Sequence, residues 1–136
     1  MMSGSDLNIY TDGGSRGNPG PAAIGVYCVN KNNTQIFSLS KRIGISTNNH
    51  AEYTAIIEAL NYIINHDIKA EKIIFFEDSL LVVNQLNGLF KVKDANLNQL
   101  KIQIEKLIQL LKVNVKFVYI PREKNMTADK LVNSAF

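Results

Sequence analysis

The chain has 136 residues, of which 46% are hydrophobic and 20% are charged. This length allows one buried core, so we expect a single domain over residues 7–136, and no apolar run approaches the roughly 20 residues that span a bilayer, which argues against a membrane protein. The net charge of +3 fits a nucleic-acid partner but does not require one.

The first residues, MMSGSDLN, contain no basic segment followed by an apolar stretch. We therefore expect no secretory signal, a cytoplasmic location and a disordered lead-in over residues 1–6. Cys28 is the only cysteine in the sequence, which excludes an internal disulfide and any multi-cysteine zinc site. Its apolar surroundings, AIGVYCV, predict a small residue of the core.

Three strands are expected in the first third of the chain. Residues 7–12 form the first, and GGSRGNPGP then supplies glycines and prolines that fit a loop. Residues 23–29 form the second strand. The stretch KNNT at 31–34 predicts a turn into a third strand over about residues 35–43. Three strands joined by short turns predict an antiparallel meander.

A long helix is expected after the polar stretch STNN at 46–49. Apolar residues recur there at helical spacing as far as about His66. The run KIIFF at 72–76 is short and apolar, which is typical of a strand covered on both faces. Residues 79–86 then predict a short helix.

The last third of the chain predicts two more helices and one more strand. Asp94 or Asn96 can cap a helix that ends near Leu111, and a strand follows over residues 115–120. Thr127 is expected to cap a final helix that carries Ala128, Leu131, Val132 and Ala135. The whole order predicts an α/β fold with a five-stranded mixed sheet, in which the last two strands are parallel to the first and helices cover both faces.

Four acidic residues occupy positions where burial is costly without a positive partner. Asp12 and Asp78 each close an apolar strand, and the ends of neighbouring parallel strands are where open α/β sheets place their sites. Glu52 lies one helical turn before Ile56, on the inward stripe of the long helix. An ion pair with a lysine or arginine is the structural alternative for Glu52. Asp129 is the least distinctive, because the dipole of the last helix alone favours an acid there.

Four converging carboxylates repel one another unless a cation lies between them. Oxygen ligands without a cysteine or histidine cluster favour Mg²⁺ or Mn²⁺. Two such ions about 4 Å apart activate a water on one side of a phosphodiester and stabilise the leaving oxygen on the other. The residues therefore predict nucleic-acid hydrolysis with no nucleophilic side chain.

The glycine-rich segment GGSRGNPG has a rival interpretation as a phosphate cradle. It lacks the GKS or GKT ending and the GxGxxG spacing of such motifs, and a strand follows it where a helix is required. We interpret it as a hairpin loop beside Asp12. His50 and His66 lie at the two ends of the long helix, where capping and the helix dipole explain them better than catalysis.

Five segments in this order, TDGGSRGNPGPA, STNNHAEYTAIIEAL, EDSLLVVNQLNG, FKVKD and PREKNMTADKLVN, resemble ribonuclease H of type 1. The resemblance covers residues 7–136. It implies the ribonuclease H-like fold, a catalytic domain, and hydrolysis of the RNA strand of RNA/DNA hybrids to give 3′-hydroxyl and 5′-phosphate ends. It also implies a two-metal site formed by Asp12, Glu52, Asp78 and Asp129.

The same resemblance implies contacts to the substrate. Asn48 and Asn49, with the backbone of Gly13, Gly14 and Ser15, would face the 2′-hydroxyls that distinguish RNA from DNA. Asn18 and Thr47 would hold a phosphate of the DNA strand. Turn chemistry and helix capping are the alternative explanation for these polar residues.

The chain departs from the family pattern at several positions. The loop PREKNMT lacks the histidine that many relatives carry, so Arg122, Glu123 or Asn125 is expected to serve in its place. Leu80 occupies a position that is often polar, and Glu77 is an extra acid beside Asp78.

The segment GLFKVKDAN is too short for the basic protrusion of some members, which leaves the lysines of FKVKD, Lys91 and Lys93, as the expected grip on the substrate. Two alternatives to hybrid cleavage remain. One is a related nuclease that acts on double-stranded RNA, whose minor groove resembles that of a hybrid. The other is a catalytically silent duplex-binding module, which would have no reason to keep four carboxylates. No obligate protein partner is implied, so we expect a monomer.

Overall fold

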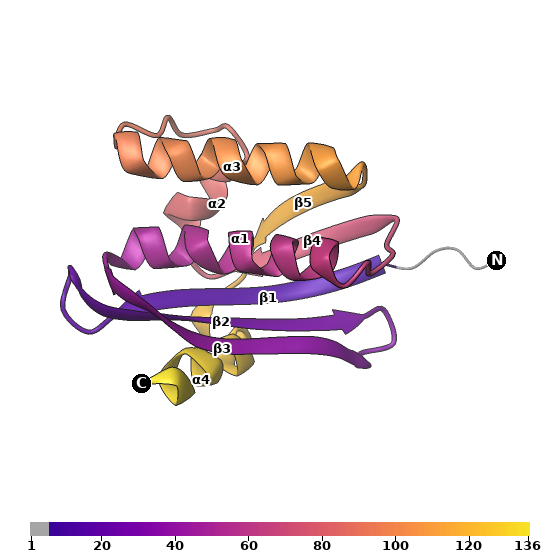
Figure 1. Cartoon of the computed structure of the whole chain (residues 1–136), viewed down its shortest axis with the longest axis horizontal. Coiled ribbons are helices and arrows are strands. Elements are labelled where there is room, and N and C mark those ends of the chain that lie inside the picture. Colours follow the sequence, from indigo (N-terminus) through magenta and orange to yellow (C-terminus); the bar gives the residue numbers. More distant parts are fainter. Residues whose placement is uncertain (1–5) are drawn as a thin grey trace.

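The computed structural model describes residues 6–136 and contains one five-stranded sheet (Figure 1). The strands are β1 Asp6–Ser15, β2 Gly20–Asn30, β3 Gln35–Ser46, β4 Lys72–Glu77 and β5 Asn114–Tyr119. They lie in the order β3-β2-β1-β4-β5. β1, β2 and β3 pair antiparallel, whereas β4 is parallel to β1 and β5 is parallel to β4. The predicted α/β fold with a mixed sheet is therefore confirmed.

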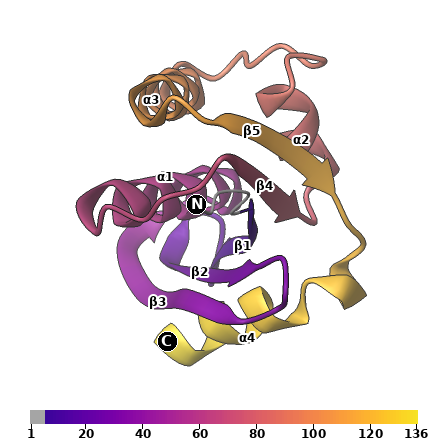
Figure 2. The same ribbon diagram turned by 90° about the vertical axis from the view of Figure 1, so that its right-hand side faces the viewer.

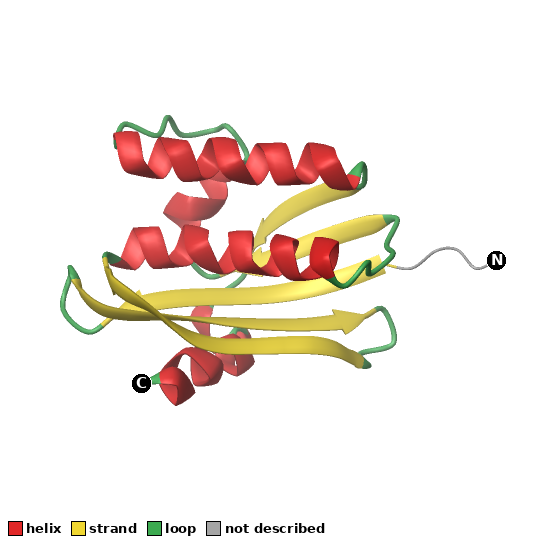
Figure 3. Ribbon diagram, in the orientation of Figure 1, coloured by secondary structure: helices red, strands yellow, loops and turns green. Residues whose placement is uncertain are grey.

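Helices lie on both faces of this sheet (Figure 2). The helical segments in residues 6–136 are α1 Asn48–Asn65, α2 Leu80–Leu86, α3 Ala95–Leu111, the short 3₁₀ helix η1 Arg122–Lys124, and α4 Met126–Ala135. α1 packs on β1 and β2, and α3 packs on α1. α4 packs on β1, β2 and β3 from the other face, as the separation of the red helices in Figure 3 shows.

The main core lies between α1 and the sheet. Its fully buried members include Ile9, Ile24, Ile56, Leu60 and Phe75. Alternate residues of β1 and β4 face this core, while the apolar stripe of α1 covers them from above. Because Glu52 belongs to that same stripe, the burial of α1 brings its carboxylate onto the sheet.

Two glycines let the helices approach the sheet closely. A Cβ at Gly13 would collide with the backbone of Ala51 in α1, and a Cβ at Gly25 would collide with the carbonyl oxygen of Ala128 in α4. Only glycine leaves room for the neighbouring backbone at these points. The first contact brings α1, which carries Glu52, against β1, and the second brings α4, which carries Asp129, against β2 at the residue paired with Asp12.

The first two strands are longer than the sequence predicted. The β1–β2 ladder continues beyond Asp12 as far as the pair Ser15–Ala22, so the three residues after Asp12 are paired strand residues and only 16–19 form the loop. Cross-strand hydrogen bonds outweigh the low strand propensity of the glycines. Asp12 consequently lies inside β1, and the prediction that it closes the strand was wrong. β3 also extends further than expected, to Ser46.

The helix caps divide into confirmed and wrong predictions. Asp94 caps α3 by accepting from the amides of Asn96 and Leu97. Thr127 does not cap α4, which begins one residue before it and has Asn125 at its N-cap with no side-chain cap hydrogen bond.

β1 begins at Asp6, the last residue of the expected lead-in, and residues 1–5 lie outside the described part. None of the helices described in residues 6–136 is long and apolar enough to cross a membrane.

Candidate active site

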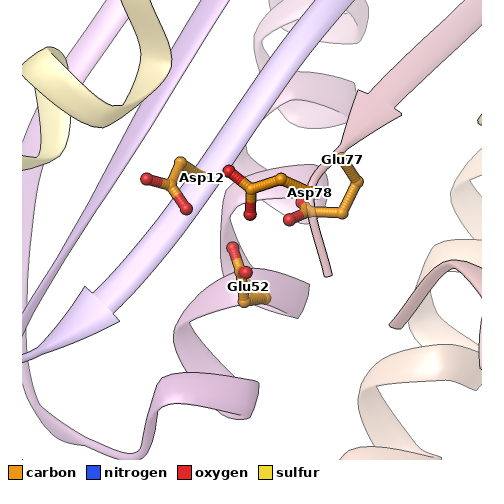
Figure 4. Close-up of side chains that lie close together, drawn as sticks. All are labelled: Asp12, Glu52, Glu77 and Asp78. Carbon is orange, nitrogen blue, oxygen red and sulfur yellow. The ribbon is translucent and has the colours of Figure 1, made fainter. Parts of the chain in front are cut away.

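Four carboxylates meet where β1, α1 and the end of β4 come together. One oxygen from each of Asp12, Glu52, Glu77 and Asp78 lies within 4.8 Å of the others. Figure 4 shows that the side chains arrive from these three elements and point toward a shared space. The structure thus brings together three of the four acids predicted for the metal site and adds Glu77.

A single backbone amide holds two of these carboxylates. The N–H of Gly13 donates to Asp12 Oδ1 at 3.0 Å and to Glu52 Oε1 at 2.6 Å. The close approach of α1 at Gly13 makes this shared contact possible, because it brings Glu52 within reach of the strand backbone. The relative orientation of Asp12 and Glu52 is therefore set by the backbone of β1.

The Asp78 carboxylate is held from the side of α4. Asn125 Nδ2 donates to Asp78 Oδ2 at 3.2 Å and to the carbonyl oxygen of Thr11 at 2.9 Å. Burial raises the pKa of Asp78, while the Asn125 hydrogen bond and the charge of Arg122 act in the opposite direction. This use of the Asn125 side chain explains why it does not cap α4. Asn125 was one of three auxiliary candidates from the sequence.

Asp129, the fourth acid predicted for the metal site, lies on α4. It lines a cavity of about 420 Å³ together with Asp12, Glu52 and Asp78. It is not one of the four acids within 4.8 Å, but its charge contributes to raising the pKa of Asp12. Arg122 also lines this cavity, whereas exposed Glu123 does not.

The electrostatics of the cluster favour a bound cation. Burial, followed by the charges of Asp78 and Asp129, raises the pKa of Asp12 to about 7. Burial and then the charge of Glu77 raise the pKa of Glu52 well above its usual range. Each shift reflects the cost of a negative charge in this place, and a divalent ion removes that cost. A donor set made only of carboxylate oxygens fits a hard divalent cation.

The substrate-binding residues expected around the start of α1 lie beside one another. Asn48 Oδ1 accepts hydrogen bonds from the N–H and the hydroxyl of Ser15, at 2.9 and 3.1 Å, and the N–H of Asn48 donates to Asn18 Oδ1 at 2.9 Å. Thr47 caps α1 by accepting from the amide of His50. Asn18, Thr47, Asn48 and Asn49 line a second cavity of about 530 Å³.

Gly13, Gly14 and Ser15, whose backbone is expected to contact substrate, line the carboxylate cavity. Lys91 and Lys93 are exposed in the connection between α2 and α3 and line neither cavity. The structure therefore brings the polar residues near α1 together, and the two lysines precede Asp94, which lines the same second cavity.

Several known proteins are similar to this chain in fold and in sequence. A family profile described as reverse transcriptase-like matches residues 10–135. The structure of LC11-RNase H1, a protein isolated from compost, superimposes with a TM-score of 0.90 at 43% sequence identity, covering 96% of this chain and 94% of that one. The chain belongs to the ribonuclease H type 1 family. The resemblance noted in the sequence is therefore confirmed.

Other proteins are also similar to this chain over most of its length. LC11-RNase H1 in complex with an RNA/DNA hybrid has a TM-score of 0.89 at 41% identity and covers 95% of each chain. Ribonuclease HI of Halobacterium salinarum is 36% identical over 132 residues, which are 97% of this chain and 65% of that protein. The bifunctional protein Rv2228c of Mycobacterium tuberculosis is 38% identical over 128 residues. This chain spans only about a third of that longer relative.

Two residues of this ribonuclease H site were not assigned from the sequence. Glu77 was noted only as an extra acid, although counting by two from Ile73 and Phe75 in β4 places it on the buried face. Thr11 is fully buried and its hydroxyl donates to Glu77 Oε2 at 2.8 Å. Strand alternation was the signal for both residues, because Thr11 follows Leu7 and Ile9 on the buried face of β1 in the same way.

Proposed function

We propose that this chain is an endoribonuclease that hydrolyses the RNA strand of RNA/DNA hybrids and leaves 3′-hydroxyl and 5′-phosphate ends. The observation that carries the proposal is the convergence of Asp12, Glu52 and Asp78, with Asp129 in the same cavity. The complex of the homologous LC11-RNase H1 with a hybrid supports the choice of substrate. Residues 7–136 are proposed to form the catalytic domain.

The proposed cofactor is Mg²⁺ or Mn²⁺, two ions per site, held by Asp12, Glu52, Asp78 and Asp129. When bound, such ions activate a water molecule and stabilise the leaving oxygen of the phosphodiester. The chain prepares the ligands, since the Gly13 amide orients Asp12 and Glu52 and Asn125 orients Asp78. No side chain is needed as nucleophile.

Recognition of the RNA strand is proposed to involve the edge beside α1. Asn48 Oδ1 is already bonded to Ser15, so its NH₂ group is the part of the side chain that serves a 2′-hydroxyl. Asn49 and the backbone of Gly13, Gly14 and Ser15 are proposed to act with it. Asn18 and Thr47, at the N-terminus of α1, are proposed to hold a phosphate of the DNA strand.

Arg122 is the best supported substitute for the loop histidine that this chain lacks. It lines the carboxylate cavity, and its charge acts on Asp78. Asn125 orients a carboxylate instead, and Glu123 lies outside the cavity. Turnover that is unchanged by Arg122→Ala would remove this role.

The proposal is tested by incubating the protein with a labelled hybrid, double-stranded RNA or DNA duplex in Mg²⁺, Mn²⁺ or EDTA. We expect cleavage of the RNA strand of the hybrid with either metal, and loss of cleavage in EDTA and in Asp12→Asn. Asp67→Asn is the matched control, because Asp67 pairs with Lys69 on the surface and is 83% exposed. Cleavage that survives EDTA or Asp12→Asn would overturn the mechanism.

Double-stranded RNA is the second candidate substrate. Leu80 follows the Asp78–Ser79 pair and is 53% exposed, so it offers an apolar surface where a polar side chain would read the minor groove. Comparable rates on double-stranded RNA and hybrid would favour this candidate. A silent duplex-binding module is the weakest alternative, because binding alone does not require the acidic cluster. We propose a cytoplasmic monomer without an obligate protein partner.

A further inference from the structure

Glu77 is a buried acid whose surroundings leave one oxygen without a partner. It ends β4, with only 1% of its surface exposed. Thr11 donates to Oε2 at 2.8 Å. Oε1 is also buried and accepts no hydrogen bond from the described residues. An unpaired carboxylate oxygen in the interior is costly, so its position calls for a compensating group.

The neighbours of Glu77 are other acids. Its carboxylate lies among those of Asp12, Glu52 and Asp78, within 4.8 Å, and Figure 4 shows it directed toward the same space. The charge of Glu77 is the largest contribution after burial to the raised pKa of Glu52. The ion pairs Lys41–Glu58 and Lys69–Asp67 involve other residues. Without an ion, Glu52 and Glu77 share a proton through their side-chain contact. A cation shared by the cluster would take the place of that proton and compensate Oε1.

We propose that Glu77 is a fourth carboxylate ligand, through Oε1, for a divalent ion also bound by Asp12, Glu52 and Asp78. The inference rests on the proposed metal-dependent function and extends its ligand set. Thr11 acts as a positioning residue, because its hydrogen bond occupies Oε2 and leaves Oε1 available to an ion.

This ligand set has a consequence for the order of binding. Mg²⁺ sites that hold substrate phosphates usually have one or two carboxylates and depend on the phosphate oxygens. Four carboxylates within reach of one ion supply more charge than such a site needs. One ion is therefore expected to bind this protein before any nucleic acid does.

The test measures Mn²⁺ and Mg²⁺ binding by isothermal titration calorimetry, with no nucleic acid present. Glu77→Gln keeps the size of the side chain and removes its charge, and we expect the Kd for Mn²⁺ to rise about tenfold or more. Glu58→Gln is the matched control, because Glu58 lies on α1 and pairs with Lys41 outside the cluster. The control should bind Mn²⁺ like the unchanged protein. Equal affinity in Glu77→Gln would overturn the proposal.

A second measurement does not depend on the folding of a variant. In the unchanged protein, the carboxyl carbon of Glu77 should shift in the ¹³C spectrum as Mg²⁺ is added, together with that of Glu52, while Glu58 stays in place. A Glu77 signal that does not respond would also overturn the inference. Hybrid cleavage is scored separately. Mn²⁺ binding that depends on Glu77 in a protein without hybrid cleavage would contradict the proposed function and leave this inference standing.

Discussion

Gly13 combines two requirements at one residue. Its missing side chain admits the backbone of Ala51, and its amide binds both Asp12 and Glu52. We expect Gly13→Ala to lower the free energy of unfolding by about 1–3 kcal/mol, because the added methyl group forces α1 away from the sheet. Hybrid cleavage should fall with it, since Glu52 moves with the helix.

Urea unfolding and initial rates check this expectation. Gly14→Ala is the control for stability, because a Cβ there would meet only Asn48 Oδ1, at 3.9 Å. Stability of Gly13→Ala equal to that of Gly14→Ala would contradict the packing argument.

Asn125 is expected to act through Asp78. Asn125→Ala removes the donor to Asp78 Oδ2 and to the Thr11 carbonyl. We expect kcat to fall about 10- to 100-fold with little change in KM, and stability to fall by about 1–3 kcal/mol because a buried acceptor loses its partner. Asn125→Asp should reduce kcat further, since it sets another acid against Asp78.

Steady-state kinetics and thermal unfolding of both Asn125 variants provide the measurement. Asn32→Ala makes the same substitution in the exposed turn between β2 and β3 and serves as the control. An effect on KM alone would show that Asn125 contacts substrate instead of positioning Asp78.

At the scale of elements, the junction of β1, α1 and β4 makes stability depend on pH. Burial raises the pKa of Asp12 to about 7 and that of Glu77 to about 8, from usual values of 3.8 and 4.5. The folded state thus keeps protons that the unfolded chain loses. Their contribution to stability is complete below the unfolded pKa values and is lost as the pH rises through the folded ones.

We therefore expect the urea midpoint in EDTA to fall between about pH 5 and pH 9. Saturating Mg²⁺ should reduce that fall, because the ion takes over the role of the protons. Midpoints measured in both buffers across this range check the sign. A metal-free protein that becomes more stable toward high pH would show that the acids do not repel one another as described.

At the scale of the whole molecule, the net charge of +3 coexists with a strongly acidic site. Attraction for a nucleic acid must therefore come from basic residues around the acids, and the exposed Lys91 and Lys93 between α2 and α3 are two candidates. A double Lys91→Ala, Lys93→Ala variant should bind hybrid more weakly. The slope of log Kd against log salt should also fall by about one for each lost phosphate contact.

Fluorescence anisotropy in EDTA over a range of salt measures this slope without cleavage. Lys31→Ala, in the turn between β2 and β3, provides a single-lysine control. A double variant with the affinity and salt slope of the unchanged protein would remove these lysines from the binding surface.

The elements of the whole fold were largely predictable from the sequence, and the errors have physical causes. Apolar residues recur with a period of two in β1 and of 3.6 in α1, and both periods are local signals. They identified the strand and the inward face of the helix that carries Glu52. The glycines after Asp12 predicted a loop, because their pairing with β2 is invisible in local propensity. The cap predicted at Thr127 was wrong because α4 already begins at Met126, with Asn125 at its N-cap.

The sequence by itself determined the order of strands and helices, the mixed sheet and the inward position of Glu52, since each follows from the spacing of neighbouring residues. Only the tertiary structure decided that Thr11 contacts Glu77, 66 positions away, and that Asn125 reaches the Thr11 carbonyl, 114 positions away. It also decided that Glu77 lies among the other acids. Contacts at such separations depend on how the elements pack, and no period along the chain encodes them.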